Sequence, residues 1–171
     1  VLPPQQVAPR NWSDVGHWYS LLTSDQIKET AELHAQSLAL ASSSSSTLAK
    51  IQALAGFVQR NIRYVAIEIG IGGFQPHPAG DIYKNRYGDC KDKVTLLRSM
   101  LADIGVDSYY VLVNSERGVV SPSIPSLQSF NHVIVAIRLP GSADAAALPA
   151  SVQDPKLGRI VYFDPTDDDV P

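Results

Sequence analysis

The chain has 171 residues and a formal net charge of −3; 44% of its residues are hydrophobic and 18% are charged. This length suits one globular domain with a sizeable core, and the composition is not that of a disordered chain or a membrane protein. The longest apolar stretches, such as 133–137, are far too short to cross a bilayer. Nothing in the charge pattern forms the basic stripe that nucleic-acid binding requires.

The two ends of the sequence favour an origin as part of a longer protein. The chain begins without a methionine and ends in polar residues shortly after a predicted strand. Residues 1–14 are rich in proline and polar residues, so we expect a linker there and a single domain over 15–171. Trp12, Trp18 and Tyr19 follow near-helical spacing, which indicates that they pack the start of the domain onto its core.

Two helices are predicted in the next part of the chain. The dipeptide at 24–25 is Ser-Asp, a typical helix start, and apolar residues follow at roughly helical spacing as far as Leu40. The serine run at 42–46 then forms a short loop. A second helix is expected over 47–61.

The second half of the chain carries most of the strand signals. Alternating and β-branched residues predict strands at 63–69, 107–114, 131–139 and 159–163. An amphipathic helix over 88–105 separates the first of these strands from the other three. Because those three are connected by loops rather than helices, we expect an antiparallel sheet and an α+β fold, with the N-terminal helices and the central helix packed on the sheet.

Three irregular segments connect these elements. Residues 70–80 are rich in glycine and proline, and 115–130 form a loop that is long for a compact domain. We expect these two loops to form the walls of a cleft. Residues 140–158 are predicted to be a variable excursion between two strands.

Cys90 is the only cysteine, and it lies in the first turn of the predicted central helix. The positive end of the helix dipole faces a thiol at that position and favours the thiolate. The helical spacing to Val94 and Leu97 places Cys90 on the buried stripe of the helix. His132 begins one predicted strand and Asp164 follows another, so a helix start docked on the sheet can bring the three residues together.

These residue types suit acyl transfer. The thiolate attacks an acyl carbon, the imidazole holds the thiol proton and later protonates the leaving amine, and the carboxylate orients the imidazole. The backbone N–H of Cys90, at a helix start, is one candidate half of an oxyanion hole. Gln75 and the Tyr64 hydroxyl are candidates for the second donor.

The residues around the cysteine are predicted to have structural roles. Asp89 and Asp92 are expected to cap the helix and to compensate its dipole. Lys91 and Lys93 are expected to be solvated, and Gly88 to allow a tight approach to the helix.

We predict that the chain has no metal site and no cofactor. His17, His34 and His77 lie apart in the sequence, without carboxylate or thiol partners at the spacing that a metal site needs. His77, between two prolines, is a candidate for the cleft wall.

Several segments resemble the transglutaminase-like superfamily, and more narrowly the bacterial transglutaminase-like domain that commonly follows a β-rich domain of unknown function. The most specific segments are RYGDCKDKVTLL, FNHVIVAI and VYFDPTD. Those that extend the resemblance from about Trp12 to Thr166 are WSDVGHWY, FVQRNIRYVAIEIG and GGFQPHPAGDIYKNRYGDCKDK.

The resemblance implies a papain-like core with Cys90 as nucleophile, His132 as base and Asp164 as orienting acid. The superfamily includes crosslinking transglutaminases, peptidases, amidases and members without activity. Its bacterial members often occur in exported multidomain proteins, which implies an extracytoplasmic or periplasmic location and neighbouring domains. Animal crosslinking enzymes carry a tryptophan directly after the cysteine, where this chain has Lys91, and they use calcium, for which the sequence shows no loop.

We therefore predict thiol-dependent hydrolysis or acyl transfer on a peptide or isopeptide amide, through a thioester on Cys90. The alternative is a catalytically silent transglutaminase-like module that binds a peptide or a neighbouring domain. Protein crosslinking is a further alternative. No nucleic-acid partner and no membrane span are expected.

Overall fold

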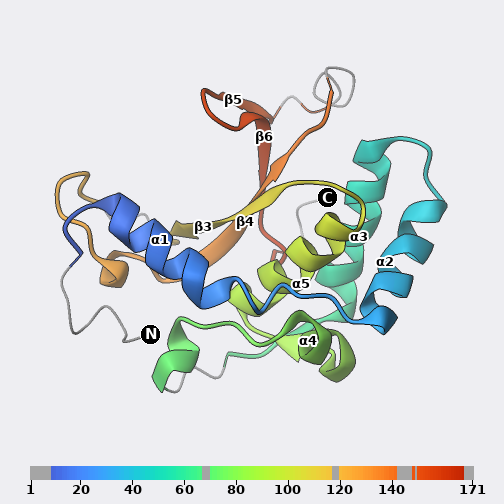
Figure 1. Cartoon of the computed structure of the whole chain (residues 1–171), viewed down its shortest axis with the longest axis horizontal. Helices are drawn as coiled ribbons and strands as arrows, with labels where there is room; N and C mark the ends of the chain where they lie inside the picture. The colour runs from blue at the N-terminus through green and yellow to red at the C-terminus, as the bar shows by residue number, and fades with distance from the viewer. Residues whose placement is uncertain (1–8, 67–69, 117–119, 142–147, 149, 168–171) are drawn as a thin grey trace.

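The computed structural model describes residues 9–66, 70–116, 120–141, 148 and 150–167 (Figure 1). The helices are α1 (Trp12–Thr23), α2 (Ala31–Ser42), α3 (Thr47–Asn61), α4 (Ala79–Asn85) and α5 (Cys90–Asp103), with the 3-10 turns η2 (Gly70–Gly73) and η3 (Leu127–Ser129). The strands are β1 (Arg63–Tyr64), β2 (Tyr87–Gly88), β3 (Ser108–Val113), β4 (His132–Arg138), β5 (Val152–Asp154) and β6 (Gly158–Phe163). None of the described helices is long and apolar enough to span a membrane.

A four-stranded sheet in the order β3-β4-β6-β5 forms one side of the molecule, and every neighbouring pair in it is antiparallel. The predicted mixture of helices with an antiparallel sheet is therefore confirmed. β5 was not predicted and lies within the expected excursion. Of the predicted strand 63–69, Arg63 and Tyr64 are in a strand, which pairs in parallel with β2. Residues 65 and 66 are not in a strand, and 67–69 lie outside the described residues.

The early helices differ from the sequence prediction at their starts. The helix expected from Ser24 begins at Ala31 instead, because the Thr30 side chain accepts the Leu33 N–H while the Ser24 hydroxyl donates back to the α1 carbonyl of Leu21. The predicted helix over 47–61 matches α3. α1 starts at Trp12, so the last residues of the segment expected to be a linker are helical, and residues 1–8 lie outside the described part.

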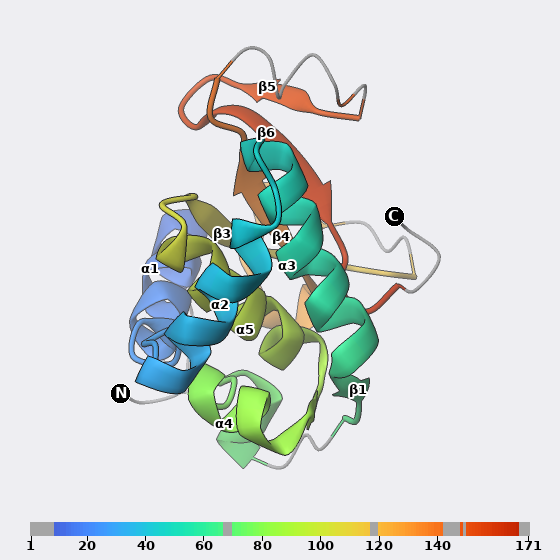
Figure 2. The ribbon, with the colours of Figure 1, turned by 90° about the vertical axis from the view of Figure 1, so that its right-hand side faces the viewer.

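The central helix α5 lies in the middle of the molecule, between the sheet and the helices α2, α3 and α4 (Figures 1 and 2). The predicted apolar stripe is in the core, with Val94, Leu97 and Leu101 all fully buried. Each such side chain contributes roughly 1.5–3 kcal/mol by leaving water. Gly105 follows the helix with φ +71°, a conformation that favours glycine, and so α5 ends where the sequence indicated.

Candidate active site

A capping box fixes the start of α5, where Cys90 is the first residue. The Asp89 carboxylate accepts the Asp92 N–H at 3.2 Å, and the Asp92 carboxylate accepts the Asp89 N–H at 3.2 Å. Both aspartates therefore cap the helix as predicted. Gly88 allows the tight approach expected of it, because a Cβ atom there would lie 2.5 Å from the Cβ of Asp92.

The prediction that Lys91 and Lys93 are solvated is wrong: each is only 2% exposed. The Lys91 ammonium contacts the Asp89 carboxylate, and the Lys93 Nζ donates to the backbone oxygen of Gln59 at 3.2 Å. Buried charges persist only when they are paired or hydrogen-bonded. The alternating Asp and Lys residues at the helix start are thus buried: Lys91 is paired with Asp89, and Lys93 is hydrogen-bonded to the backbone.

The sheet places His132 and Asp164 side by side. His132 is the first residue of β4, and the antiparallel register pairs Val135 of β4 with Phe163 at the end of β6. Asp164, the residue after β6, therefore lies beside the start of β4. His132 Nε2 and Asp164 Oδ2 are 2.6 Å apart, in a half-buried position where the two side chains are 16% and 27% exposed.

Asp164 uses its two oxygens differently. Oδ1 accepts the backbone N–H of Thr166 at 2.9 Å and its hydroxyl at 2.7 Å, forming an Asx-type turn that ends the strand. Oδ2 is left for His132. Burial acts to raise the pKa of Asp164, but the hydrogen bonds from His132 and Thr166 outweigh it and hold that pKa below its ordinary value.

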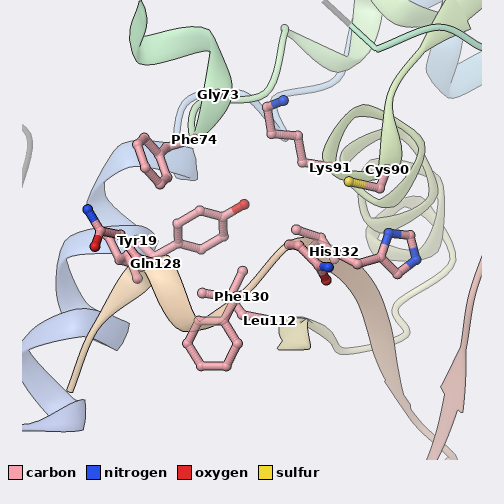
Figure 3. Close-up of a pocket in the computed structure, with 12 residues that line it drawn as sticks. Tyr19, Gly73, Phe74, Cys90, Lys91, Leu112, Gln128, Phe130 and His132 are labelled. Atoms are coloured by element: carbon pink, nitrogen blue, oxygen red, sulfur yellow. The ribbon is translucent and has the colours of Figure 1, made fainter. Parts of the chain in front are cut away.

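Cys90 lies next to the imidazole ring of His132 (Figure 3). Hydrogen bonding to Asp164, and next the interaction with the Cys90 side chain, raises the pKa of His132 to about 10. Since Nε2 is held by Asp164, Nδ1 is the ring nitrogen left for the thiol. The structure therefore brings the three predicted residues together in the order thiol, imidazole, carboxylate.

A cleft of about 340 Å³ opens beside Cys90 and His132. It is lined by Tyr19, Gly73, Phe74, Cys90, Lys91, Leu112, Leu127, Gln128, Phe130, Asn131, His132 and Val133. Both loops that were expected to form its walls contribute lining residues. Its lining combines apolar and aromatic side chains with a few polar groups, which is the usual composition of a ligand site.

Three residues proposed for the cleft do not line it. The Gln75 side-chain amide donates to the Leu22 carbonyl at 3.4 Å, and Tyr64 is 49% exposed on the short strand β1. The His77 ring contacts Asp92, with Nδ1 3.0 Å from Oδ2, and His77 is not among the lining residues. Neither predicted second oxyanion donor therefore lines the cleft beside the thiol.

Helix α1 contributes to both walls of the cleft, which the sequence did not reveal. Trp12 donates its indole N–H to the Pro122 carbonyl at 2.9 Å and packs edge-on against Phe130. Trp18 packs edge-on against Phe74 in the other wall. The helical spacing of these aromatic residues indicated packing, but it could not indicate which segments they would contact.

One group of described residues offers ligand atoms that a metal ion could share. Glu29, His34 and Asp103 present such atoms within 4.8 Å of one another, and His34 Nδ1 is 2.8 Å from Asp103 Oδ1 and 3.2 Å from Glu29 Oε2. The prediction that His34 and His77 lack carboxylate partners is therefore wrong. Asp103 ends the 14-residue helix that Cys90 begins, so this group lies about 20 Å from the thiol.

No protein-family model and no curated protein matches the chain. Two crystal structures match it in fold. One is of a "putative protease" from Parabacteroides distasonis ATCC 8503, with a TM-score of 0.57 and 18% identity over 71% of this chain. The other is of a "putative cysteine protease" from Cytophaga hutchinsonii, with a TM-score of 0.56 and 13% identity over 95% of this chain.

The chain shares the fold of these two proteins. It spans 24% of the length of the first and 47% of the second, so each is much longer than the part that matches. At these identities the similarity concerns the fold alone, and site chemistry has to be argued from the residues of this chain.

Proposed function

We propose that this chain is a transglutaminase-like, papain-type thiol enzyme that hydrolyses or transfers the acyl group of a peptide or isopeptide amide. The observation that carries this proposal is the convergence of three chain segments at one end of the cleft: the start of α5, the first residue of β4 and the residue after β6. A thiol, an imidazole and a carboxylate in series form the set that nucleophilic acyl transfer needs. The fold shared with two proteins described as proteases adds support.

In the first half of the proposed reaction, Cys90 attacks. His132 is an imidazolium at neutral pH because its pKa is raised to about 10, and a cation beside sulfur favours the thiolate. The sulfur bonds to the carbonyl carbon while the carbonyl electron pair moves to oxygen. When this intermediate collapses, the C–N bond breaks, His132 gives its proton to the leaving amine, and a thioester remains on Cys90.

In the second half, His132 accepts a proton from a water or an amine that attacks the thioester. The C–S bond then breaks, which releases the acyl product and restores the Cys90 thiolate beside the His132 imidazolium. Asp164 keeps the ring oriented through Nε2 in both halves. The Cys90 N–H is among the first N–H groups of α5, which have no carbonyl partner within the helix, so it can donate to the oxyanion.

p-Nitrophenyl acetate tests this proposal without knowledge of the natural substrate, because its activated ester acylates a thiolate. We expect a burst of one nitrophenolate per chain at neutral pH, no burst from Cys90→Ala, and acylation slower by about 10²-fold or more in His132→Ala. Circular dichroism of the variants controls for folding. A native chain that gives no burst, with Cys90 also inert to iodoacetamide, would favour the silent module that uses its cleft to bind a peptide or a neighbouring domain.

Casein, which has amide bonds to cleave and glutamine side chains to act as acyl donors, tests whether water or an amine accepts the acyl group. Release of peptides from casein by the native chain but not by Cys90→Ala would indicate hydrolysis. Incorporation of dansylcadaverine into casein would indicate crosslinking. We expect no incorporation, since Lys91 occupies the position next to the nucleophile where crosslinking enzymes that the chain resembles have tryptophan.

A further inference from the structure

We propose that the Tyr19 hydroxyl is the second donor of the oxyanion hole, acting together with the backbone N–H of Cys90. This inference rests on the function proposed above and adds to it a residue from α1, a helix that carries none of the three proposed catalytic residues. It concerns how the negative charge on the carbonyl oxygen would be stabilised after the thiolate attacks.

The Tyr19 hydroxyl is a buried donor without a partner. Among the described residues, four buried side-chain polar atoms lack a hydrogen bond, and they belong to Trp18, Tyr19, Ser99 and Asp103. Only Tyr19 of these residues lines the cleft beside Cys90. Native proteins leave few buried polar groups unpaired, and such a group calls for a functional explanation.

The hydroxyl is also directed toward the reacting atoms. Figure 3 shows the Tyr19 ring in the cleft with its oxygen pointing toward the space beside Cys90. The ring is held edge-on against Tyr110, with centroids 5.3 Å apart, and it contacts the Trp18 ring at 6.1 Å. A donor whose ring is fixed by packing before substrate arrives suits oxyanion stabilisation, because the ring itself needs no reorientation during the reaction.

Tyr19 keeps its proton under all conditions in which the site would work. Burial, and next the neighbouring Tyr110 and Cys90, raises the pKa of Tyr19 well above its ordinary value. The side chain is therefore a neutral O–H donor, able to give a hydrogen bond to an oxyanion without adding negative charge near the thiolate. Two other potential donors are already occupied: the Lys91 ammonium contacts Asp89, and the Gln75 amide donates to Leu22.

An unpaired hydroxyl stabilises a transition state selectively. Among the described residues, the Tyr19 hydroxyl has no hydrogen-bond partner. A substrate oxygen reaches it only when the cleft wall adjusts around the acyl group, a tightening that catalytic hydrogen bonds often undergo on binding. The hydrogen bond then forms as charge develops on oxygen, which raises the rate of the chemical step rather than ground-state affinity.

Two reactions of the Cys90 thiol distinguish a role of Tyr19 in oxyanion stabilisation from a general loss of thiol reactivity. Acylation by p-nitrophenyl acetate forms an oxyanion, whereas alkylation by iodoacetamide displaces iodide at a saturated carbon and forms none. In Tyr19→Phe we expect the second-order rate constant for acylation of Cys90 to fall by about 10²-fold, with the alkylation rate nearly unchanged. Cys90→Ala supplies the background reaction of other groups.

Tyr83→Phe is the matched control, because Tyr83 is also 6% exposed but its hydroxyl donates to Gln36 instead of facing the cleft. It should change neither rate and should lower the melting temperature. Tyr19→Phe should not lower it, since no hydrogen bond is lost. An acylation rate that falls no further than the alkylation rate would overturn the inference while leaving the proposed function standing. A native chain that p-nitrophenyl acetate does not acylate would remove the proposed function, and this inference with it.

Discussion

At the scale of single residues, the ion pair between His132 and Asp164 gives the site a pH signature. The pKa of His132 is raised from 6.5 to about 10, so its contribution to stability is complete below about pH 6.5 and is lost as the pH rises through 10. The pKa of Asp164 is lowered from 3.8, so its contribution is complete above about pH 4 and is lost on further acidification. The pair therefore stabilises the fold most between about pH 4 and pH 6.5.

Asp164→Asn tests this signature. The Asn side-chain oxygen can still accept from Thr166 and keep the turn, but the negative charge facing His132 is gone. We expect urea unfolding at about pH 5.5 to show a loss of roughly 1.5–3 kcal/mol in the free energy of unfolding, the usual value of a hydrogen bond to a charged group. At about pH 10 the native chain and the variant should be nearly equal in stability.

Asp154→Asn is the control for this measurement. Asp154 accepts the N–H groups of Lys156 and Leu157, both at 2.8 Å, in a turn that none of its described hydrogen bonds or ion pairs connects to a histidine. Its lowered pKa affects stability only on the acid side. A stability loss in Asp164→Asn that stays constant from about pH 5.5 to pH 10 would contradict the assigned ion pair.

At the scale of elements, α5 was predictable and its surroundings were not. Its start, its end and its apolar stripe follow from local signals: an aspartate cap, a glycine after the last turn and helical spacing. The burial of Lys91 and Lys93 depends on α3 and the segment before α4 covering the same turn, which no local pattern specifies. The site residues on strand ends could be predicted because an antiparallel register brings such ends together. The directions of the Gln75 and Tyr64 side chains depend instead on tertiary contacts, such as the hydrogen bond from Gln75 to Leu22, which no local pattern specifies.

Gly88→Ala should destabilise the start of α5. The added Cβ would meet the Asp92 Cβ at 2.5 Å and its Oδ2 at 2.9 Å, so the Asp92 side chain, which closes the capping box, has to move. We expect a loss of about 1–3 kcal/mol in the free energy of unfolding, measured in urea. Gly16→Ala in α1 is the matched control: a Cβ there meets nothing within 4 Å, so alanine should leave stability unchanged or raise it by about 0.5–1 kcal/mol. Equal effects of the two substitutions would contradict the assigned close approach.

At the scale of the whole molecule, the cleft is assembled from segments far apart in the chain. The helix at the start of the described chain, the loop after β1, the start of α5 and the segment before β4 all line it. The sequence could predict most of these segments one by one. It could not predict that α1 covers the cleft, because that packing rests on contacts such as the Trp12 bond to Pro122, 110 residues away.

Trp12 should hold the segment before β4 in place. Its N–H bond to Pro122 and its edge-on contact with Phe130 are each worth about 0.5–1.5 kcal/mol. Removing both in Trp12→Ala should raise amide hydrogen exchange in 120–130 by about tenfold, since 1.4 kcal/mol corresponds to a factor of ten. Trp12→Phe keeps an aromatic ring but loses the N–H, so its effect should be smaller. Peptides from α3, which lie on the other side of α5, should exchange at the native rate in both variants; faster exchange there would mean that Trp12 stabilises the whole fold instead of one wall of the cleft.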